Sequence, residues 1–172
     1  MAGWRGILTG IALAASCSTG GGGSTVKGQL PEAGDLESLV IRTDFTDDAR
    51  WNEVAGAITR PVSVPPAGTF QANVRLVDDL RYDGLTISRL LELVPAGAEP
   101  FFLFLVDSQT LQHPDHPVLV VDLYHERGRF FRVIPSEMWG VQNNLSIANM
   151  DWEDFSEVVD SDGVFRGFPR PQ

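Results

Sequence analysis

The sequence predicts a single α/β domain with a mixed β-sheet of about six strands and helices packed on its faces. Segments typical of strands and helices alternate as β-α-β-α-β, then β-β, then α-β, between residues 36 and 169. Two continuous apolar runs, at residues 101–106 and 118–124, are typical of central strands covered on both faces. A chain of 172 residues is also long enough to bury one sizeable core.

The first elements follow from short hydrophobic patterns. The β-branched run at residues 38–43 predicts a buried strand, and the alternation at residues 72–77 predicts a half-buried one. Between them, apolar residues at helical spacing predict a helix over residues 47–58, with Thr46 as its cap. Prolines and glycine indicate a loop at residues 60–68.

The later elements are predicted in the same way. Thr86 is expected to cap a second helix, and residues 107–117 to form a loop between the two central strands. A tight turn then leads into residues 129–134, which should pair antiparallel with the strand before them. Asp151 is expected to cap a last helix, before a short final strand at residues 164–168.

The charge balance limits the classes of partner. The chain has 23 acidic and 13 basic residues, a net charge of -10. Such a surface repels nucleic-acid phosphates and anionic lipid headgroups, so binding to nucleic acid and direct adsorption to membranes are disfavoured. Cys17 is the only cysteine, which excludes an internal disulfide and a cysteine-based zinc site.

The N-terminal segment resembles a bacterial lipoprotein signal. Its apolar run, residues 7–15, is far shorter than the ~20 residues that a membrane-spanning helix needs. Small residues at 14–16 stand directly before Cys17, as in a lipoprotein processing box. This resemblance implies a signal peptide at residues 1–16, a lipid anchor on Cys17 and a Gly/Ser-rich tether at residues 17–35.

A misassigned start codon is the alternative explanation of this leader. Ala14 stands where such signals usually have leucine, and Arg5 is the only basic residue before the apolar run. The glycine tract is not a phosphate-binding loop, because no strand precedes it and no G-K-[ST] follows it.

Three aspartates stand at the ends of predicted strands. Asp44, Asp79 and Asp107 would meet at one edge if their strands are parallel, and carboxylates there could hold a hard cation such as magnesium. A response-regulator receiver site is excluded because the domain has no lysine. A haloacid-dehalogenase-like site is excluded because "TDFTDD" does not match its motif, D-x-D-x-[TV]. The alternative is that these aspartates end strands and cap helices.

Three histidines lie in predicted loops. His113, His116 and His125 could bind a transition metal if the loops fold back on one another. Exposed, solvated turns are the alternative, because prolines flank the first two. No G-x-S-x-G motif or other nucleophile arrangement is present, so we expect no catalytic residues and no cofactor.

A polar stretch at residues 133–155 is the least generic part of the domain. Trp139 could anchor a partner, and Asn143, Asn144 and Asn149 could line a binding pocket or groove. The alternative is that these asparagines satisfy turns and helix ends.

Several long motifs resemble a bacterial domain family of unknown function that is common in actinobacteria. They are "LVIRTDFTDDARW", "FLFLVD", "VLVVDLY", "FRVIPSEMWGVQNNLSIANMDWEDF" and "DGVFRGF", and the likeness covers about residues 30–168. The family has no established activity, so the resemblance implies one coherent domain and no catalytic residues.

Three functions are compatible with these patterns. The first is a lipid-anchored, non-catalytic binding or protein-interaction module on the outer face of the cell membrane, attached through Cys17. The second is a cytoplasmic interaction protein behind a spurious leader, similar to the immunity proteins that neutralise a basic toxin. The third is a cation-dependent enzyme that uses Asp44, Asp79 and Asp107.

Overall fold

A six-stranded mixed sheet organises the molecule, as the sequence predicted. The computed structural model describes residues 29–94, 97 and 99–169. The strand order is β4-β1-β5-β6-β7-β8. The strands are β1 (Ser38–Arg42), β4 (Val74–Val77), β5 (Phe102–Val106), β6 (Val118–Asp122), β7 (Phe130–Val133) and β8 (Val164–Phe165).

The sheet combines a parallel part with an antiparallel part. Strand β1 pairs in parallel with both β4 and β5, in a register that places Val40 opposite Leu76 and Phe104. Strands β5, β6 and β7 are successively antiparallel, and β8 returns parallel to β7. The antiparallel pairing of β6 with β7 confirms that prediction, but residues 123–129 connect the two strands through a longer loop and not a tight turn.

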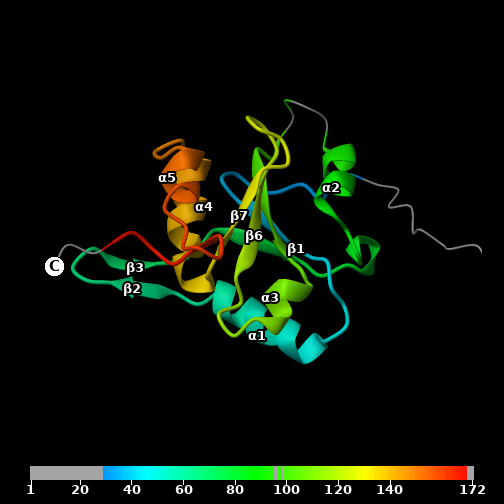
Figure 1. Cartoon of the computed structure of the whole chain (residues 1–172), viewed down its shortest axis with the longest axis horizontal. Coiled ribbons are helices and arrows are strands. Elements are labelled where there is room, and N and C mark those ends of the chain that lie inside the picture. The colour runs from blue at the N-terminus through cyan, green and yellow to red at the C-terminus, as the bar shows by residue number, and fades with distance from the viewer. Residues whose placement is uncertain (1–28, 95–96, 98, 170–172) are drawn as a thin grey trace, which may run out of the picture.

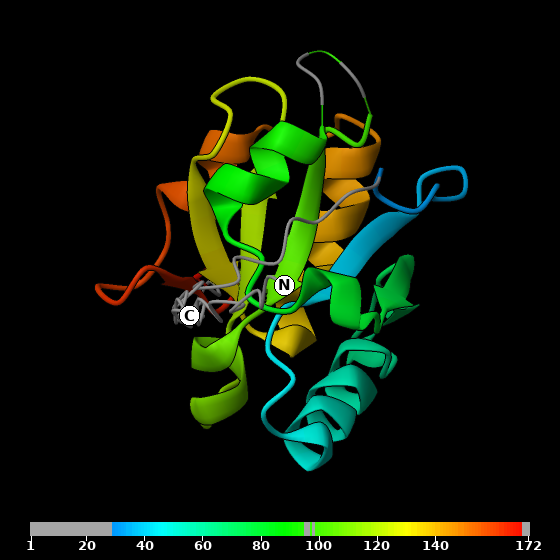
Figure 2. The same cartoon turned by 90° about the vertical axis from the view of Figure 1, so that its right-hand side faces the viewer.

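Helices cover both faces of the sheet (Figure 1). One face packs against side chains of α1 (Asp48–Ile58), α3 (Ser108–Gln112), α4 (Met138–Ser146) and α5 (Trp152–Ser156). The other face packs against the 3-10 turn η1 (Leu80–Tyr82) and α2 (Ile87–Leu93), and Figure 2 looks onto α2 from that side. A further 3-10 turn, η2 (Pro135–Glu137), leads into α4.

The side-chain alternation of β1 explains the two cores. Val40 belongs to the cluster under α1, α4 and α5, whereas Leu39 and Ile41 belong to the cluster under α2. All three side chains are fully buried. A run of apolar residues without polar alternation is therefore required here, because both faces of the strand are covered.

The structure corrects three local predictions. The segment predicted as a loop at residues 60–68 contains β2 (Val62–Val64), which pairs antiparallel with β3 (Gly68–Phe70) in a separate hairpin. The segment predicted as a loop at residues 107–117 contains the short helix α3. Asp47, and not Thr46, caps α1, because its carboxylate accepts from the Arg50 N–H at 2.9 Å.

The packed part of the chain begins within the predicted tether. Leu30 is half-buried and packs against the core cluster beneath α2, ahead of the expected domain start at residue 36. The predicted signal peptide, Cys17 and the glycine tract lie outside the described residues. Among the helices that the structure describes, none is long and apolar enough to cross a membrane.

Candidate functional site

The carboxyl ends of the parallel strands bring the strand-end aspartates to one edge, as expected. Strands β1 and β5 are neighbours, and the chain leaves them in opposite directions, through α1 toward β4 and through α3 toward β6. Such a switch point is where open α/β sheets usually bind ligands.

Each of the three aspartates at this edge has its own local partner. The Asp44 carboxylate accepts from the Thr46 N–H at 2.8 Å. Asp79 caps η1 and pairs with Arg81 at 2.7 Å, and the hydrogen bond from Arg81 lowers the pKa of this carboxyl. Asp107 caps α3 through the Thr110 N–H.

Asp107 also forms an ion pair with Arg132 on β7. Arg132 Nη2 lies 2.6 Å from Asp107 Oδ2, and Arg132 Nη1 donates to the Pro117 carbonyl at 2.9 Å. Burial raises the pKa of Asp107, but the hydrogen bonds from Arg132 and Thr110 outweigh it, and the pKa is lowered. The Asp107 carboxylate therefore links the end of β5 to β7 through its ion pair with Arg132.

Arg42, the last residue of β1, holds further acids at the same edge. Its side chain is 3% exposed and reaches Asp48 at 2.6 Å and Asp78 at 3.3 Å. Its guanidinium carbon lies 4.2 Å from the centre of the Phe45 ring. Within the residues that the structure describes, no group of three or more His, Cys, Asp or Glu could hold a metal ion. The geometry of this edge thus favours a structural role for its acids.

The histidines have separate environments. His116 is buried, and its Nδ1 lies 3.0 Å from the Thr110 carbonyl oxygen. His113 Nδ1 accepts from the Asp115 N–H at 3.1 Å, and His125 packs edge-on against Tyr124. His125 is exposed and His113 partly exposed, in line with the alternative of solvated turns, whereas the burial of His116 differs from it.

Trp139 and the three asparagines lie on and just after α4. The Trp139 ring stacks on Phe70 of β3 with 4.5 Å between centroids, so it attaches the β2–β3 hairpin to the helix. Asn144 donates to the Gly140 carbonyl and accepts from the Asn149 side chain, both at 2.7 Å. Asn143 accepts the Ile147 N–H through its backbone carbonyl. None of these four residues is among those that line the cavity described next.

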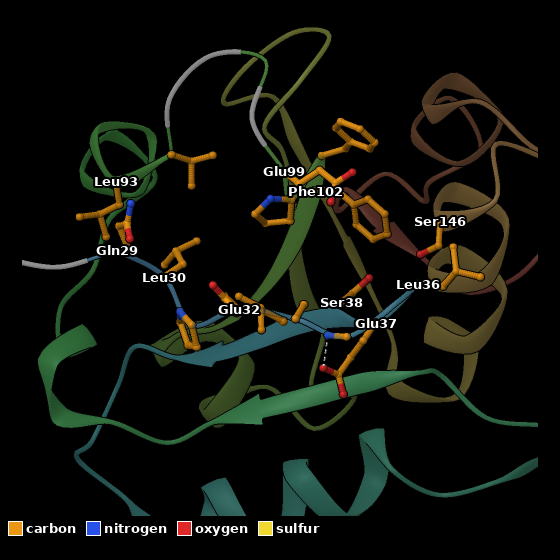
Figure 3. Close-up of a pocket in the computed structure, with 17 residues that line it drawn as sticks. Gln29, Leu30, Glu32, Leu36, Glu37, Ser38, Leu93, Glu99, Phe102 and Ser146 are labelled. Carbon is orange, nitrogen blue, oxygen red and sulfur yellow. Dashed lines mark hydrogen bonds between the residues drawn. The ribbon is translucent and has the colours of Figure 1, made fainter.

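A cavity of about 530 Å³ lies at the opposite, amino ends of β1 and β5 (Figure 3). This volume is within the range of known small-ligand sites. Its lining is mostly apolar and comes from four parts of the chain: residues 29–39, the end of α2, residues 99–102, and Ser146 of α4. Figure 3 shows Leu30 and Leu93 on one side, and Leu36 and Phe102 on the other.

One buried amide holds the α4 side of the cavity. Gln142 is fully buried; its Oε1 accepts from the Asn73 N–H at 2.9 Å, and its Nε2 donates to the Leu36 carbonyl at 2.8 Å. The same Nε2 donates to Ser146 Oγ at 2.9 Å. Gln142 therefore joins α4 to the starts of β1 and β4, and it positions Leu36 and Ser146 at the cavity.

Two arginines hold the other walls. Arg127 Nη2 donates to the carbonyls of Leu91 and Val94 at the end of α2, at 3.0 and 2.6 Å. Arg75 Nη1 donates to the Glu32 carbonyl at 2.7 Å and fixes residues 29–34 against β4. The cavity is thus bounded by segments with defined hydrogen bonds to the rest of the fold.

The charged residues in the described lining of the cavity are all acidic. Glu32, Glu37 and Glu99 line it, and none of its described lining residues is Lys, Arg or His. Glu37 accepts from the Gly34 N–H at 2.9 Å, the contact dashed in Figure 3. Within the described part of the chain, none of the three glutamates takes part in an ion pair.

Exposed apolar side chains extend the cavity at the surface. We call Leu36, Phe101, Tyr124 and Ile147 the apolar rim; their side chains are between 46% and 59% exposed. Leu36 and Phe101 line the cavity, the Tyr124 ring lies 4.8 Å from that of Phe101, and Ile147 follows Ser146. Asp122 orients the loop that carries Tyr124 by accepting its N–H at 2.7 Å.

The sequence patterns did not indicate this cavity. Residues 29–35 belong to the tether that the sequence predicts, and the hydrogen-bond partners of Gln142 are up to 106 positions away along the chain. A weak local indication of the cavity is "EPFF", where the acidic residue Glu99 precedes an apolar strand. The described lining combines apolar surface with carboxylates.

Comparison with known proteins identifies the domain without giving it an activity. No curated protein matches the chain significantly. A family model described as a domain of unknown function, DUF6924, matches residues 37–168, which are most of the described fold and include both ends of the sheet. The chain therefore belongs to the DUF6924 family.

Proposed function

We propose that this domain is a non-catalytic protein-interaction module and that the cavity at the amino ends of β1 and β5 is its binding site. The observation that carries the proposal is the cavity of about 530 Å³, whose lining includes the exposed side chains of Leu36 and Phe101, with Tyr124 packed against Phe101. Apolar patches of this kind on otherwise soluble domains are typical of interaction sites.

The opposite edge of the sheet supports a binding role over the enzymatic alternative. Asp44, Asp79 and Asp107 are each engaged in a cap or an ion pair, so a shared cation would have to displace those contacts. The cavity offers carboxylates and apolar groups, which suit recognition.

Site-specific photo-crosslinking in cells that make the protein tests the binding role. A photoreactive phenylalanine analogue replaces Phe101 at the cavity or, as matched control, Val158 on another surface; the two side chains are 49% and 41% exposed. We expect a discrete crosslinked protein from position 101 and not from position 158. No crosslink at position 101, or equal products at both, would contradict the proposal.

We further propose that the module is attached to the outer face of the cell membrane by lipid on Cys17. The support is the sequence before the domain: the small residues at 14–16 directly before Cys17 and the glycine tract after it. The family match begins at residue 37, so the leader is additional to the shared domain.

Metabolic labelling with an alkyne fatty acid tests this location. The wild-type chain should carry the label and Cys17→Ser should not. An unlabelled wild-type chain in the cytoplasmic fraction would instead favour the alternative, a cytoplasmic interaction protein with a misassigned start. The binding site itself is common to both alternatives.

A further inference from the structure

The occupant of the cavity can be specified further from its charge and its surface, on the basis of the binding function proposed above. The lining contains Glu32, Glu37 and Glu99, and no basic residue among its described members. The nearby Arg75 and Arg127 are engaged with backbone carbonyls of the walls. Three glutamates therefore belong to the described lining of the cavity, and both of these guanidinium groups are bonded to its walls.

The apolar surface reaches beyond the cavity. Leu39 and Phe102 line it and are buried, while Leu36 and Phe101 line it and are about half exposed, as is Tyr124 beside Phe101. A small molecule confined to the cavity would leave the outer part of the apolar rim in water. A protein segment with several apolar side chains would cover both, as interfaces with a buried centre and a surrounding contact ring do.

An aromatic pair lies close to Glu99 in the chain. The rings of Phe101 and Tyr124 lie 4.8 Å apart with a 60° tilt, and Phe101 is two residues after Glu99. A guanidinium group stacks on aromatic faces and bonds carboxylates in a planar fork, whereas an ammonium group does neither as well.

We propose that the cavity binds a segment of a partner protein in which an arginine stands beside apolar side chains. The apolar side chains enter the cavity and cover the rim, and the arginine faces the glutamates and the aromatic pair. A segment with acidic residues at the same place is repelled, so the glutamates determine which segments bind.

A random twelve-residue peptide library displayed against the folded full-length chain tests the proposal. Enriched peptides should contain arginine next to apolar residues more often than the starting library does. For a selected peptide, replacement of its arginine by lysine should weaken binding about two- to fivefold, and replacement by glutamate should abolish it.

Two triple variants separate charge at the cavity from overall charge. Glu32→Gln, Glu37→Gln and Glu99→Gln together remove the cavity charges, and the amide of Gln at position 37 can still accept from Gly34. Glu53→Gln, Asp83→Asn and Glu157→Gln remove equal charge at exposed positions that do not line the cavity. The cavity triple should raise the dissociation constant about tenfold and the control triple less than twofold, with both variants checked for unchanged circular dichroism.

The outcomes distinguish this inference from the function on which it rests. Selected peptides could fail to bind the Phe101→Ser variant but bind the cavity triple variant as tightly as the wild-type chain. That result would overturn the charge inference and leave the binding site in place. A set of peptides indifferent to both Phe101→Ser and the cavity triple would overturn both.

Two further measurements would detect a different occupant of the cavity. Sedimentation of the full chain as a dimer that Phe101→Ser dissociates would place a second copy on the rim and overturn the proposal. Stronger peptide binding after Arg5→Gln with Lys27→Gln would show that the chain's own N-terminal segment competes, which would overturn it as well.

Discussion

The two ends of the parallel strands use acidic residues in opposite ways. At the carboxyl ends, the arginines at positions 42 and 132 lie within 3.3 Å of Asp48, Asp78 and Asp107. At the amino ends, three glutamates line a cavity whose described lining has no basic residue. Acidic residues stabilise the fold at one end, and at the other end they line the cavity that we propose as the binding site.

The difference shows that the strand-end position of an acid does not decide its role. Asp107 and Glu99 flank the same strand, β5, one after its end and the other before its start. Asp107 meets an arginine from β7, whereas Glu99 faces the cavity. Substitutions at the two ends should therefore differ in their effects on stability and on binding.

The largest loss of stability is expected from Asp107→Ala. It removes the partner of Arg132, which is 11% exposed, and the cap of α3, so the free energy of unfolding should fall by about 3 kcal/mol. Urea denaturation followed by circular dichroism measures this loss. A decrease below about 1 kcal/mol would mean that this end of the sheet does not depend on the ion pair.

Gln142→Leu should have the next largest effect. It leaves the Asn73 N–H and the Leu36 carbonyl without the amide that now bonds them, and we expect a loss of about 2 kcal/mol. The cavity wall should loosen at the same time, so binding of a selected peptide should weaken. Gln142→Glu keeps the length of the side chain and the acceptor for Asn73, and serves as the comparison.

A smaller effect is expected from pH. At Asp122, burial raises the pKa, but the N–H groups of Glu126 and Tyr124 and the side chain of Arg129 outweigh it, so the pKa is lowered from 3.8. A lowered folded-state pKa contributes stability above the unfolded-state pKa, and this is lost as the pH falls through the folded-state value. The free energy of unfolding should thus decline below about pH 4.

Asp122→Asn provides the control for this pH dependence. The variant should be less stable than wild type at pH 7 and should lose less of its remaining stability between pH 5 and pH 2, as judged by urea denaturation at each pH. An identical acid dependence in both proteins would assign the decline to other carboxylates, such as Asp107.

The smallest effect on stability is expected from the triple replacement of Glu32, Glu37 and Glu99 by glutamine. None of the three forms an ion pair within the described part of the chain, so stability should stay within about 1 kcal/mol of wild type. Thermal unfolding checks this. A loss as large as that of Asp107→Ala would show that the amino end is also structural, and would remove the contrast between the two ends.

Much of the fold could be predicted because its signals are local. The buried runs of β1, β5 and β6 and the caps Thr86 and Asp151 were recognised from a few adjacent residues. The β2–β3 hairpin and α3 were missed because both are short and rich in turn residues, and α4 was missed because residues 138–146 have the pattern of a polar stretch. The edge that collects the strand-end aspartates was also predicted, although their partners were not.

The candidate site could not be predicted because its walls come from distant segments. Leu36 and Gln142 are 106 positions apart, and Arg127 meets Leu91 across 36 positions. The packing of residues 29–34 against the domain depends on Arg75, which looks like an ordinary exposed residue of an edge strand.

The sequence by itself determined the α/β class, the order along the chain of the six strands of the sheet and the acidic surface, since these depend on composition and on patterns over a few residues. Only the tertiary structure decided which acids meet arginines and where apolar side chains stay exposed. Ion pairs such as Arg42 with Asp78, and the cavity itself, need residues far apart in the chain to converge. Local sequence patterns carry no information about such convergence, because it is produced by the packing of the sheet and its helices.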